Sequence, residues 1–165
     1  CRSLRLRGSG DAARVGRVTR DEIAQAFAPL KGRYAWGARV GAESLFSFEV
    51  GEPRLEVVEH HDARGELRRE VVPRGRHRFA LLDCRFELAF DGETAATDEH
   101  GRGAVAAAAD RLSGQALEAV EWQGDVLRLA FDLGATLRVW RHPQSEPGSA
   151  VWELDVGSEA IVWRA

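Results

Sequence analysis

Phe48-Glu49-Val50-Gly51, which returns as Phe131-Asp132-Leu133-Gly134 in the second half of the chain, is the pattern on which the fold depends. In both copies an aromatic, an acidic and an aliphatic residue precede a glycine. Alternation of apolar and polar residues is typical of a half-buried strand, and the glycine is typical of the turn that ends it. The pattern therefore predicts two equivalent strand ends, one in each half.

The correspondence extends upstream of both copies. Leu30 and Gly32 correspond to Leu112 and Gly114, and an alanine-rich apolar stretch precedes each pair. This self-similarity predicts a duplicated unit, one helix followed by antiparallel strands. A chance match between two amphipathic segments is the alternative. The expected fold class is α+β, an antiparallel β-rich single domain. Its two similar halves cover about residues 19–93 and 97–165.

Local signals place the helices and the strands. Thr19 followed by Glu22 has the spacing of a capping box, so a helix is expected to begin there and to end by Gly32. A second helix is expected at residues 104–112, after a linker at 94–103. Strand-forming stretches are expected within residues 34–58, broken at Gly41 and at residues 51–53, and within residues 78–90, 116–122, 126–132, 136–141, 151–155 and 160–163. Turns are expected at Asp62–Gly65 and at Asp91-Gly92.

Length and composition are those of an ordinary globular domain: 165 residues, 44% hydrophobic and 30% charged. Residues 1–20 hold six arginines and one acid, whereas the rest of the chain holds 17 basic and 25 acidic residues. We expect residues 1–18 to form a basic arm and residues 19–165 a single domain. An acidic body repels phosphate backbones, which argues against nucleic-acid binding by the folded part. No apolar run is long enough for a membrane helix.

The two cysteines, Cys1 and Cys84, are too few for a disulfide scaffold. This usage favours a reducing cytoplasm. A cysteine in first position is also found in mature bacterial lipoproteins, but the arginine-rich residues 2–7 are unlike the flexible spacer that follows such an anchor. A truncated chain or a shifted start is the interpretation that we favour for Cys1.

The densest cluster of metal-type ligands is His60-His61-Asp62 beside Glu59. Adjacent residues on a strand point to opposite faces, so only one of the two histidines could join a given site. We interpret the cluster as a charged hairpin tip, and we expect no metal and no cofactor.

Two further arrangements resemble catalytic ones. Cys84 could be a nucleophile with His77 or His100 as its base, but the alternation around it predicts a buried thiol. Glu49 and Asp132 could face each other as paired carboxylates, but their positions beside turns predict outward polar residues. The chain has no glycine-rich phosphate loop, no serine-centred elbow and no paired CxxC motif. We therefore expect no catalytic residues.

Four of the five tryptophans lie on predicted strands of the second half. Most are expected to pack in the core or on a sheet face. Trp140 and Trp163 each precede an arginine near a strand end, and if exposed they would be suitable interface anchors.

The second half has a run that reads Leu112-Ser-Gly-Gln115, then Leu127-Arg-Leu-Ala-Phe131-Asp-Leu-Gly134, then Leu137-Arg-Val139 and Trp152-Glu-Leu154. This run resembles a group of small, mostly uncharacterised bacterial proteins, which are similar in size and strand content to the immunity-type proteins that neutralise toxins of competing bacteria. The resemblance mainly covers residues 112–154. Its motif is structural, so it implies a function but no site residues.

The leading hypothesis is a non-enzymatic, cytoplasmic protein-binding module of the immunity type, which occludes a toxin that could be basic. The alternatives are an enzyme or small-molecule binder with a pocket between the halves, and a structural homodimer. The residues expected to contact a partner protein are Glu59, His60, His61, Asp62, Trp140 and Glu146.

Overall fold

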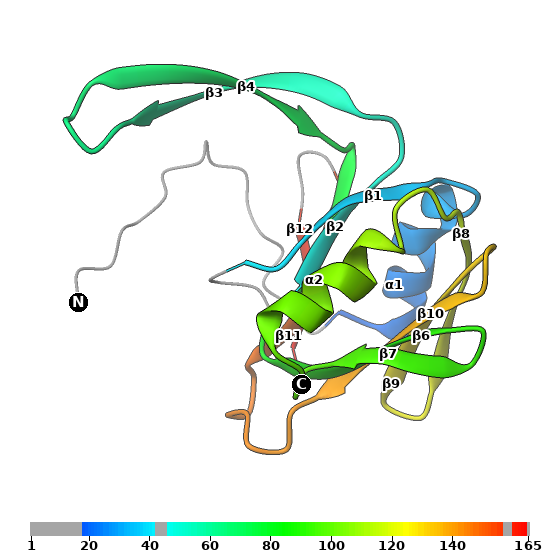
Figure 1. Cartoon of the computed structure of the whole chain (residues 1–165). Coiled ribbons are helices and arrows are strands. Elements are labelled where there is room, and N and C mark those ends of the chain that lie inside the picture. The colour runs from blue at the N-terminus through cyan, green and yellow to red at the C-terminus, as the bar shows by residue number, and fades with distance from the viewer. Residues whose placement is uncertain (1–17, 42–45, 157–159, 165) are drawn as a thin grey trace.

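The computed structural model describes residues 18–41, 46–156 and 160–164. It is a sandwich of two five-stranded antiparallel sheets, with two short helices and a projecting hairpin (Figure 1). The expected basic arm lies outside the described residues, except for Val18. No helix among the described residues is long and apolar enough to cross a membrane.

Sheet 1 has the strand order β1-β2-β5-β11-β12. Its strands are β1 (Ala35–Arg39), β2 (Phe46–Val50), β5 (His77–Leu81), β11 (Ala150–Asp155) and β12 (Ala160–Arg164). Sheet 2 has the order β7-β6-β10-β9-β8. Its strands are β7 (Glu93–Thr97), β6 (Cys84–Phe90), β10 (Ala135–Arg141), β9 (Val126–Phe131) and β8 (Leu117–Gln123).

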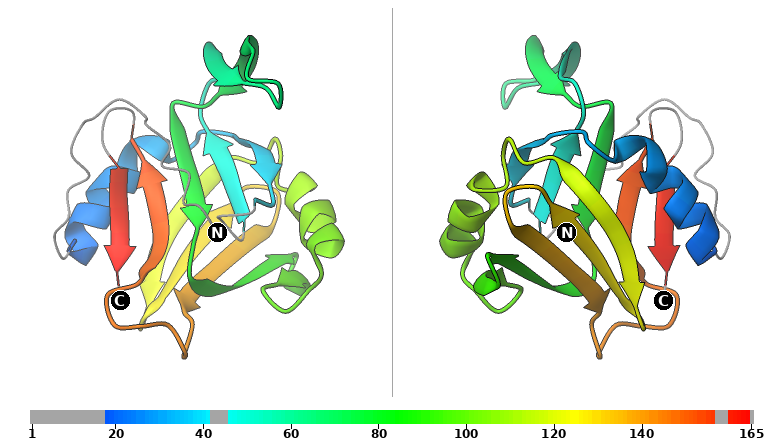
Figure 2. Two further views of the ribbon diagram at one scale, coloured as in Figure 1. Left: turned by 90° about the vertical axis from the view of Figure 1, so that its left-hand side faces the viewer. Right: turned by 90° about the vertical axis from the view of Figure 1, so that its right-hand side faces the viewer.

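The helices are α1 (Arg20–Phe27), continued by a 3-10 turn (Ala28–Leu30), and α2 (Arg102–Asp110). Figure 2 shows them on opposite sides of the sandwich. The predicted capping box at the start of α1 is confirmed: the Thr19 hydroxyl accepts from the Glu22 N–H, and the Glu22 carboxylate accepts from the Thr19 N–H at 2.8 Å. The hairpin consists of β3 (Arg54–His61) and β4 (Leu67–Arg74).

Each half of the chain contributes to both sheets. The first half supplies β1, β2 and β5 to sheet 1 and β6 and β7 to sheet 2. The second half supplies β8, β9 and β10 to sheet 2 and β11 and β12 to sheet 1. The halves are joined through two strand pairs, β5 with β11 and β10 with β6. Both sheets are therefore built from both halves.

The two halves also meet in a reciprocal set of backbone hydrogen bonds, around a bridge between Tyr34 and Ala116. The Gly32 N–H donates to the Leu117 carbonyl at 2.7 Å, and the corresponding Gly114 N–H donates to the Ala35 carbonyl at 2.8 Å. Both glycines have a positive backbone φ, +75° and +86°, which residues other than glycine rarely adopt. The matched glycines are thus required by the contact between the halves. Descent of the halves from one ancestor remains a prediction.

The core lies between the sheets and beneath the helices. On sheet 1, Phe46 and Phe48 point inward and their rings lie 6.2 and 6.1 Å from those of Phe86 and Phe131 on sheet 2. Aromatic pairs at this separation add to the stabilisation from burial itself. The α+β, antiparallel β-rich fold class is therefore confirmed.

Two segments differ from the expectation. Residues 94–97 of the predicted linker belong to β7, which pairs with β6, so the first half ends after residue 97 rather than at 93. The glutamate and the two alanines of β7 have weak strand preference, and pairing with β6 overrides it. Residues 59–77 are expected to form a long charged loop around the turn at Asp62–Gly65, but strand pairing continues to His61 and resumes at Leu67. The predicted turn is confirmed, with the Gly65 N–H donating to the Asp62 carbonyl at 2.9 Å.

Candidate functional site

The hairpin of residues 54–74, here called the arm, projects from one end of the sandwich (Figures 1 and 2). Its strands pair with each other and with no other described strand. Both outer edges therefore carry unpaired backbone groups, which can pair with another chain. A two-stranded ribbon alone is marginally stable in water, so an arm of this kind is suited to packing on a second surface.

One face of the arm is apolar. Side chains alternate along a strand, so Leu55 and Val57 share a face with Pro73 and Val71, the residues opposite them on β4. We call the following residues the apolar face of the arm: Leu55, Val57, Leu67, Val71 and Pro73. Four of them are large and exposed: Leu55 (77%), Val57 (59%), Leu67 (53%) and Val71 (59%). Among the other described residues, only Tyr34 and Leu133 are exposed large hydrophobics.

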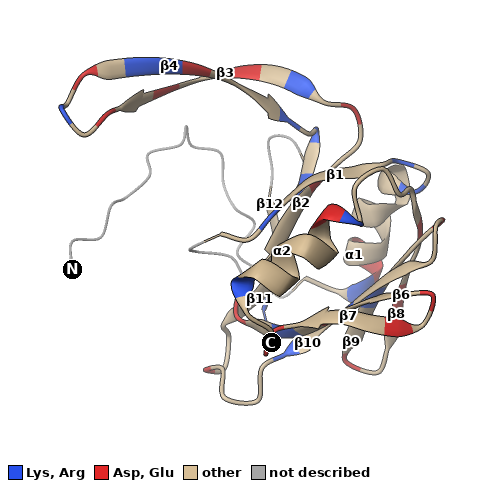
Figure 3. Cartoon of the chain, viewed as in Figure 1, with Lys and Arg blue, Asp and Glu red and all other residues tan. Residues whose placement is uncertain are grey.

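Charges of both signs alternate along the arm, as Figure 3 shows. The arm contains five arginines and five acidic residues: Arg54, Arg64, Arg68, Arg69, Arg74, Glu56, Glu59, Asp62, Glu66 and Glu70. Its formal charge is zero with histidines neutral, so the acidic excess of the chain lies on the body. On the apolar face, the Arg69 Nε lies 2.7 Å from the Glu59 Oε1. The arm thus presents an apolar face in which this ion pair lies between the pair Val57 and Val71 and the more distant Leu67.

Asp62 shapes the tip of the arm. Its carboxylate accepts hydrogen bonds from the N–H groups of Arg64 and Glu66, at 2.8 and 3.0 Å, and from the Arg68 Nε at 3.1 Å. These donors stabilise the charged form, and the pKa of Asp62 is lowered, mainly by the N–H groups of Glu66 and Arg64. Asp62 therefore has a structural role in the turn.

Glu49 fixes the base of the arm to sheet 1. Its side chain is only 4% exposed, and its Oε2 accepts from the Gly75 N–H at 3.2 Å. The Nη atoms of Arg39 and Arg74 lie 3.8 and 3.9 Å from its Oε1. Glu49 lies on the strand face opposite Phe48, as predicted, but it is buried, so the prediction of an outward polar residue is wrong for Glu49. It is right for the matched residue, Asp132, which is exposed. Asp132 accepts from the Ala116 N–H at 2.8 Å.

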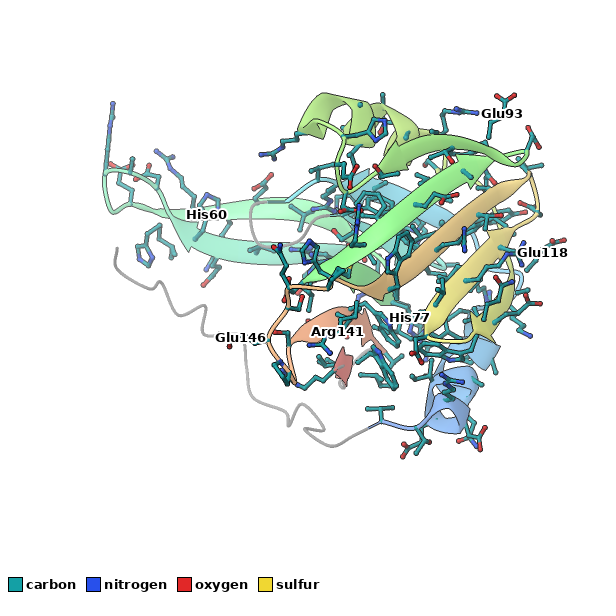
Figure 4. The ribbon with its side chains drawn as sticks, turned by 90° about the horizontal axis from the view of Figure 1, so that it is seen from below. His60, His77, Glu93, Glu118, Arg141 and Glu146 are labelled. Carbon is teal, nitrogen blue, oxygen red and sulfur yellow. The ribbon has the colours of Figure 1, made fainter. Side chains whose placement is uncertain are left out.

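The residues predicted to contact a partner lie in three separate places. Glu59, His60 and His61 are on the arm, with the histidines on opposite faces, and Asp62 begins the turn. Trp140 is half-buried on the outer face of sheet 2, in register with Arg85. Glu146 lies in the loop between β10 and β11, at the end of the molecule opposite the arm that carries His60 (Figure 1); both residues are labelled in Figure 4. The structure does not bring the six into one surface.

Cys84 and His100, considered as a nucleophile and its base, lie in different surroundings. Cys84 points into the core and is 3% exposed, and burial raises the pKa of its thiol to about 12. The expected buried thiol is confirmed. His100 is held in the turn after β7, where its Nδ1 accepts from the Thr97 N–H at 3.1 Å. Among the described residues, no group of three or more His, Cys, Asp or Glu is arranged to hold a metal ion.

A groove of about 1030 Å³ lies beside the base of the arm. Its walls come from α1, from the segments that join the arm to β2 and β5, from Val156 directly after β11, and from β12. Residues of both halves line the groove, as was expected of a pocket between the halves. The groove lies at the edge of the sandwich, since the core fills the space between the sheets. His77 and Glu22 are half-buried titratable residues in its wall.

Sequence reasoning missed both the apolar face and the groove. Leu55 and Val57 are assigned to ordinary strands, since the alternation of a half-buried strand and of an unpartnered one is the same, whereas Leu67 and Val71 fall in the charged segment 59–77. The available signal was the unusual charge of residues 54–74, which leaves few residues for a core. The groove has no local signal, because its walls are far apart in the sequence.

No family model, no curated protein and no solved structure matches this chain.

Proposed function

We propose that this chain is a protein-binding domain whose arm docks by its apolar face on an apolar surface of a partner protein. The observation that carries the proposal is the exposure of Leu55, Val57, Leu67 and Val71 on one face of a projecting ribbon. Contiguous exposed apolar residues rimmed by charges are characteristic of interaction sites. Covering such a face removes apolar area from water, which is favourable by about 25 cal/mol per Å².

The specific role that we propose is of the immunity type, with the cytoplasmic chain bound to a toxin whose active surface it occludes. Two points support this role. Residues 112–154 resemble a group of proteins similar to immunity-type proteins, and the acidic charge and the exposed apolar face lie on different parts of the molecule. The acidic charge lies on the body and can attract a basic partner over a distance, whereas the neutral arm supplies the apolar contact that determines how long the complex lasts.

The test is a binding experiment with the toxin domain that this proposal expects a neighbouring gene to encode. We expect the wild-type chain and the domain to elute together in size-exclusion chromatography. Val57→Asp combined with Val71→Asp should abolish co-elution, because burying two carboxylates without partners is costly. Leu133→Asp is the matched control: Leu133 is 68% exposed but lies between β9 and β10, away from the arm.

Unchanged binding by the double arm variant would contradict the role of the apolar face. The absence of any toxin-like neighbour that binds would contradict the immunity-type role.

A homodimer is a second candidate, favoured by the unpaired edges of the arm. Light scattering of the wild-type chain alone separates the two. A dimer that the double arm variant converts into a monomer would assign the apolar face to a second copy, whereas a monomeric wild-type chain leaves that face for the other protein.

A further inference from the structure

The groove beside α1 combines an apolar wall with a cationic one. Its apolar residues are half-buried and rest against the hydrophobic core: Val18, Ala26, Val156 and Ile161. Such a wall can take up an aliphatic chain without first having to be assembled. The volume of about 1030 Å³ is at the upper end of the range for small-molecule sites.

The cationic wall consists of Arg33, Arg54 and Arg76, opposed by two glutamates that already have partners. Glu22 is engaged by Thr19 in the capping box, and Glu52 lies 3.9 Å from Arg33. Arg54 and Arg76 have no ion-pair partner within the described part of the chain. Two guanidinium groups are thus available to an anion at the base of the arm.

His77 lies in the same groove, and its Nδ1 is buried without a hydrogen-bond partner among the described residues. The pKa of His77 is lowered, first by desolvation and then by the charges of Arg76 and Arg33. The carbonyl and the carboxylate of Asp155 act in the opposite direction but do not offset these effects. An anion beside Arg76 would counter its charge and would also favour the protonated ring.

We infer that this groove binds a small amphipathic carboxylate, with its aliphatic chain against Val156 and Ile161 and its carboxylate between Arg54 and Arg76. Guanidinium groups bind carboxylates through charge-assisted, often bidentate hydrogen bonds. The requirement for both parts follows from the two walls: a short acid would leave the apolar wall uncovered, and an uncharged chain would leave the arginines without a partner. The inference does not depend on the proposed partner protein.

The test uses three probes of known composition, followed by NMR of the full chain. Octanoate has both the chain and the charge, octanol has only the chain, and acetate has only the charge. We expect octanoate to bind at least about tenfold more tightly than either of the others, since one charge-assisted hydrogen bond contributes about 1.5–3 kcal/mol. Octanoate should shift the signals of Val18, Ala26 and Ile161 and should raise the pKa of His77.

Two variants of exposed arginines test the cationic wall, one with the substitutions inside the groove and one with a substitution outside it as the control. Arg54→Gln combined with Arg76→Gln should weaken octanoate binding by tenfold or more and abolish the pKa rise of His77. Arg64→Gln, at the tip of the arm, removes the same kind of charge outside the groove and should leave binding unchanged. Equal binding of octanol and octanoate would overturn the inference, as would equal weakening by Arg64→Gln or the absence of octanoate binding at about 10 mM, above the millimolar range of weak complexes.

Discussion

Glu49 and Gly75 show how single residues connect the arm to the body. A Cβ atom added at Gly75 would lie 2.8 Å from the Glu49 Cβ and 2.9 Å from the His77 carbonyl oxygen. Glycine is therefore needed for the close approach of the arm base to β2, and that approach in turn buries the Glu49 carboxylate. The expectation of an outward polar residue at Glu49 was right about the face of the strand and wrong about exposure, because Arg39, Arg74 and Gly75 come from elsewhere in the chain.

Gly75→Ala is accordingly predicted to destabilise the protein by about 1–3 kcal/mol, the usual cost of overpacking. Urea denaturation followed by tryptophan fluorescence measures this difference. Gly103→Ala is the matched control, since no atom lies within 4 Å of a Cβ added there and the residue is within α2. That control should be neutral or stabilising by up to about 1 kcal/mol. Equal midpoints for the two variants would show that the close approach at Gly75 costs nothing.

At the scale of elements, the arm is an insertion between two strands that would otherwise form an ordinary hairpin. Val50 at the end of β2 is paired with His77 at the start of β5, so the chain leaves and re-enters sheet 1 at one point. The corresponding strands of the second half, β9 and β10, are joined directly through residues 132–134. No residue of β3 or β4 belongs to the buried core.

Replacement of residues 52–76 by a two-residue turn is therefore predicted to leave the body folded. The variant also carries Glu49→Thr, so that no carboxylate stays buried without Gly75 and Arg74. We expect a cooperative thermal transition and the circular dichroism of an antiparallel sheet, together with loss of partner binding. A non-cooperative transition would mean that the arm is part of the folding unit rather than a projecting element.

For the whole molecule, the exchange of strands between the halves has a consequence for folding. Each half supplies three strands to one sheet and two to the other, and the faces of both sheets are buried only when the halves interlock. A half alone would lose the contacts that its inner faces make with the other half, such as Phe48 with Phe131 and Phe79 with Trp152, and this loss of apolar burial exceeds the marginal stability of a small domain.

Chains divided between His100 and Gly101 are predicted to be unfolded when expressed separately and to reassemble when co-expressed. Nuclear magnetic resonance reports this directly, through the chemical-shift dispersion of each fragment alone and of the mixture. Dispersed spectra from either fragment alone would show that one half can bury its own core, and would contradict the interlocked arrangement.

The features that could be predicted from the sequence are those specified by neighbouring residues. The capping box of Thr19 and Glu22 and the turn at Asp62–Gly65 depend on side chains and backbone groups a few positions apart. The same is true of the inward alternation of Cys84, Phe86 and Leu88 on β6. These signals determined the α+β class and most of the elements.

Tertiary structure alone decided which elements meet. The pairing of β5 with β11 and of β10 with β6 depends on strands far apart in the chain, and no local pattern distinguishes it from pairing within each half. Contacts between separated segments also decided the burial of Glu49 by Arg39 and Arg74 and the joining of the arm base with Val156 and Ile161 in one groove. The physical reason is that burial belongs to the packed assembly, whereas periodicity reports only which side of a strand a residue occupies. The matched glycines therefore indicated two similar halves, and packing made them one interlocked sandwich.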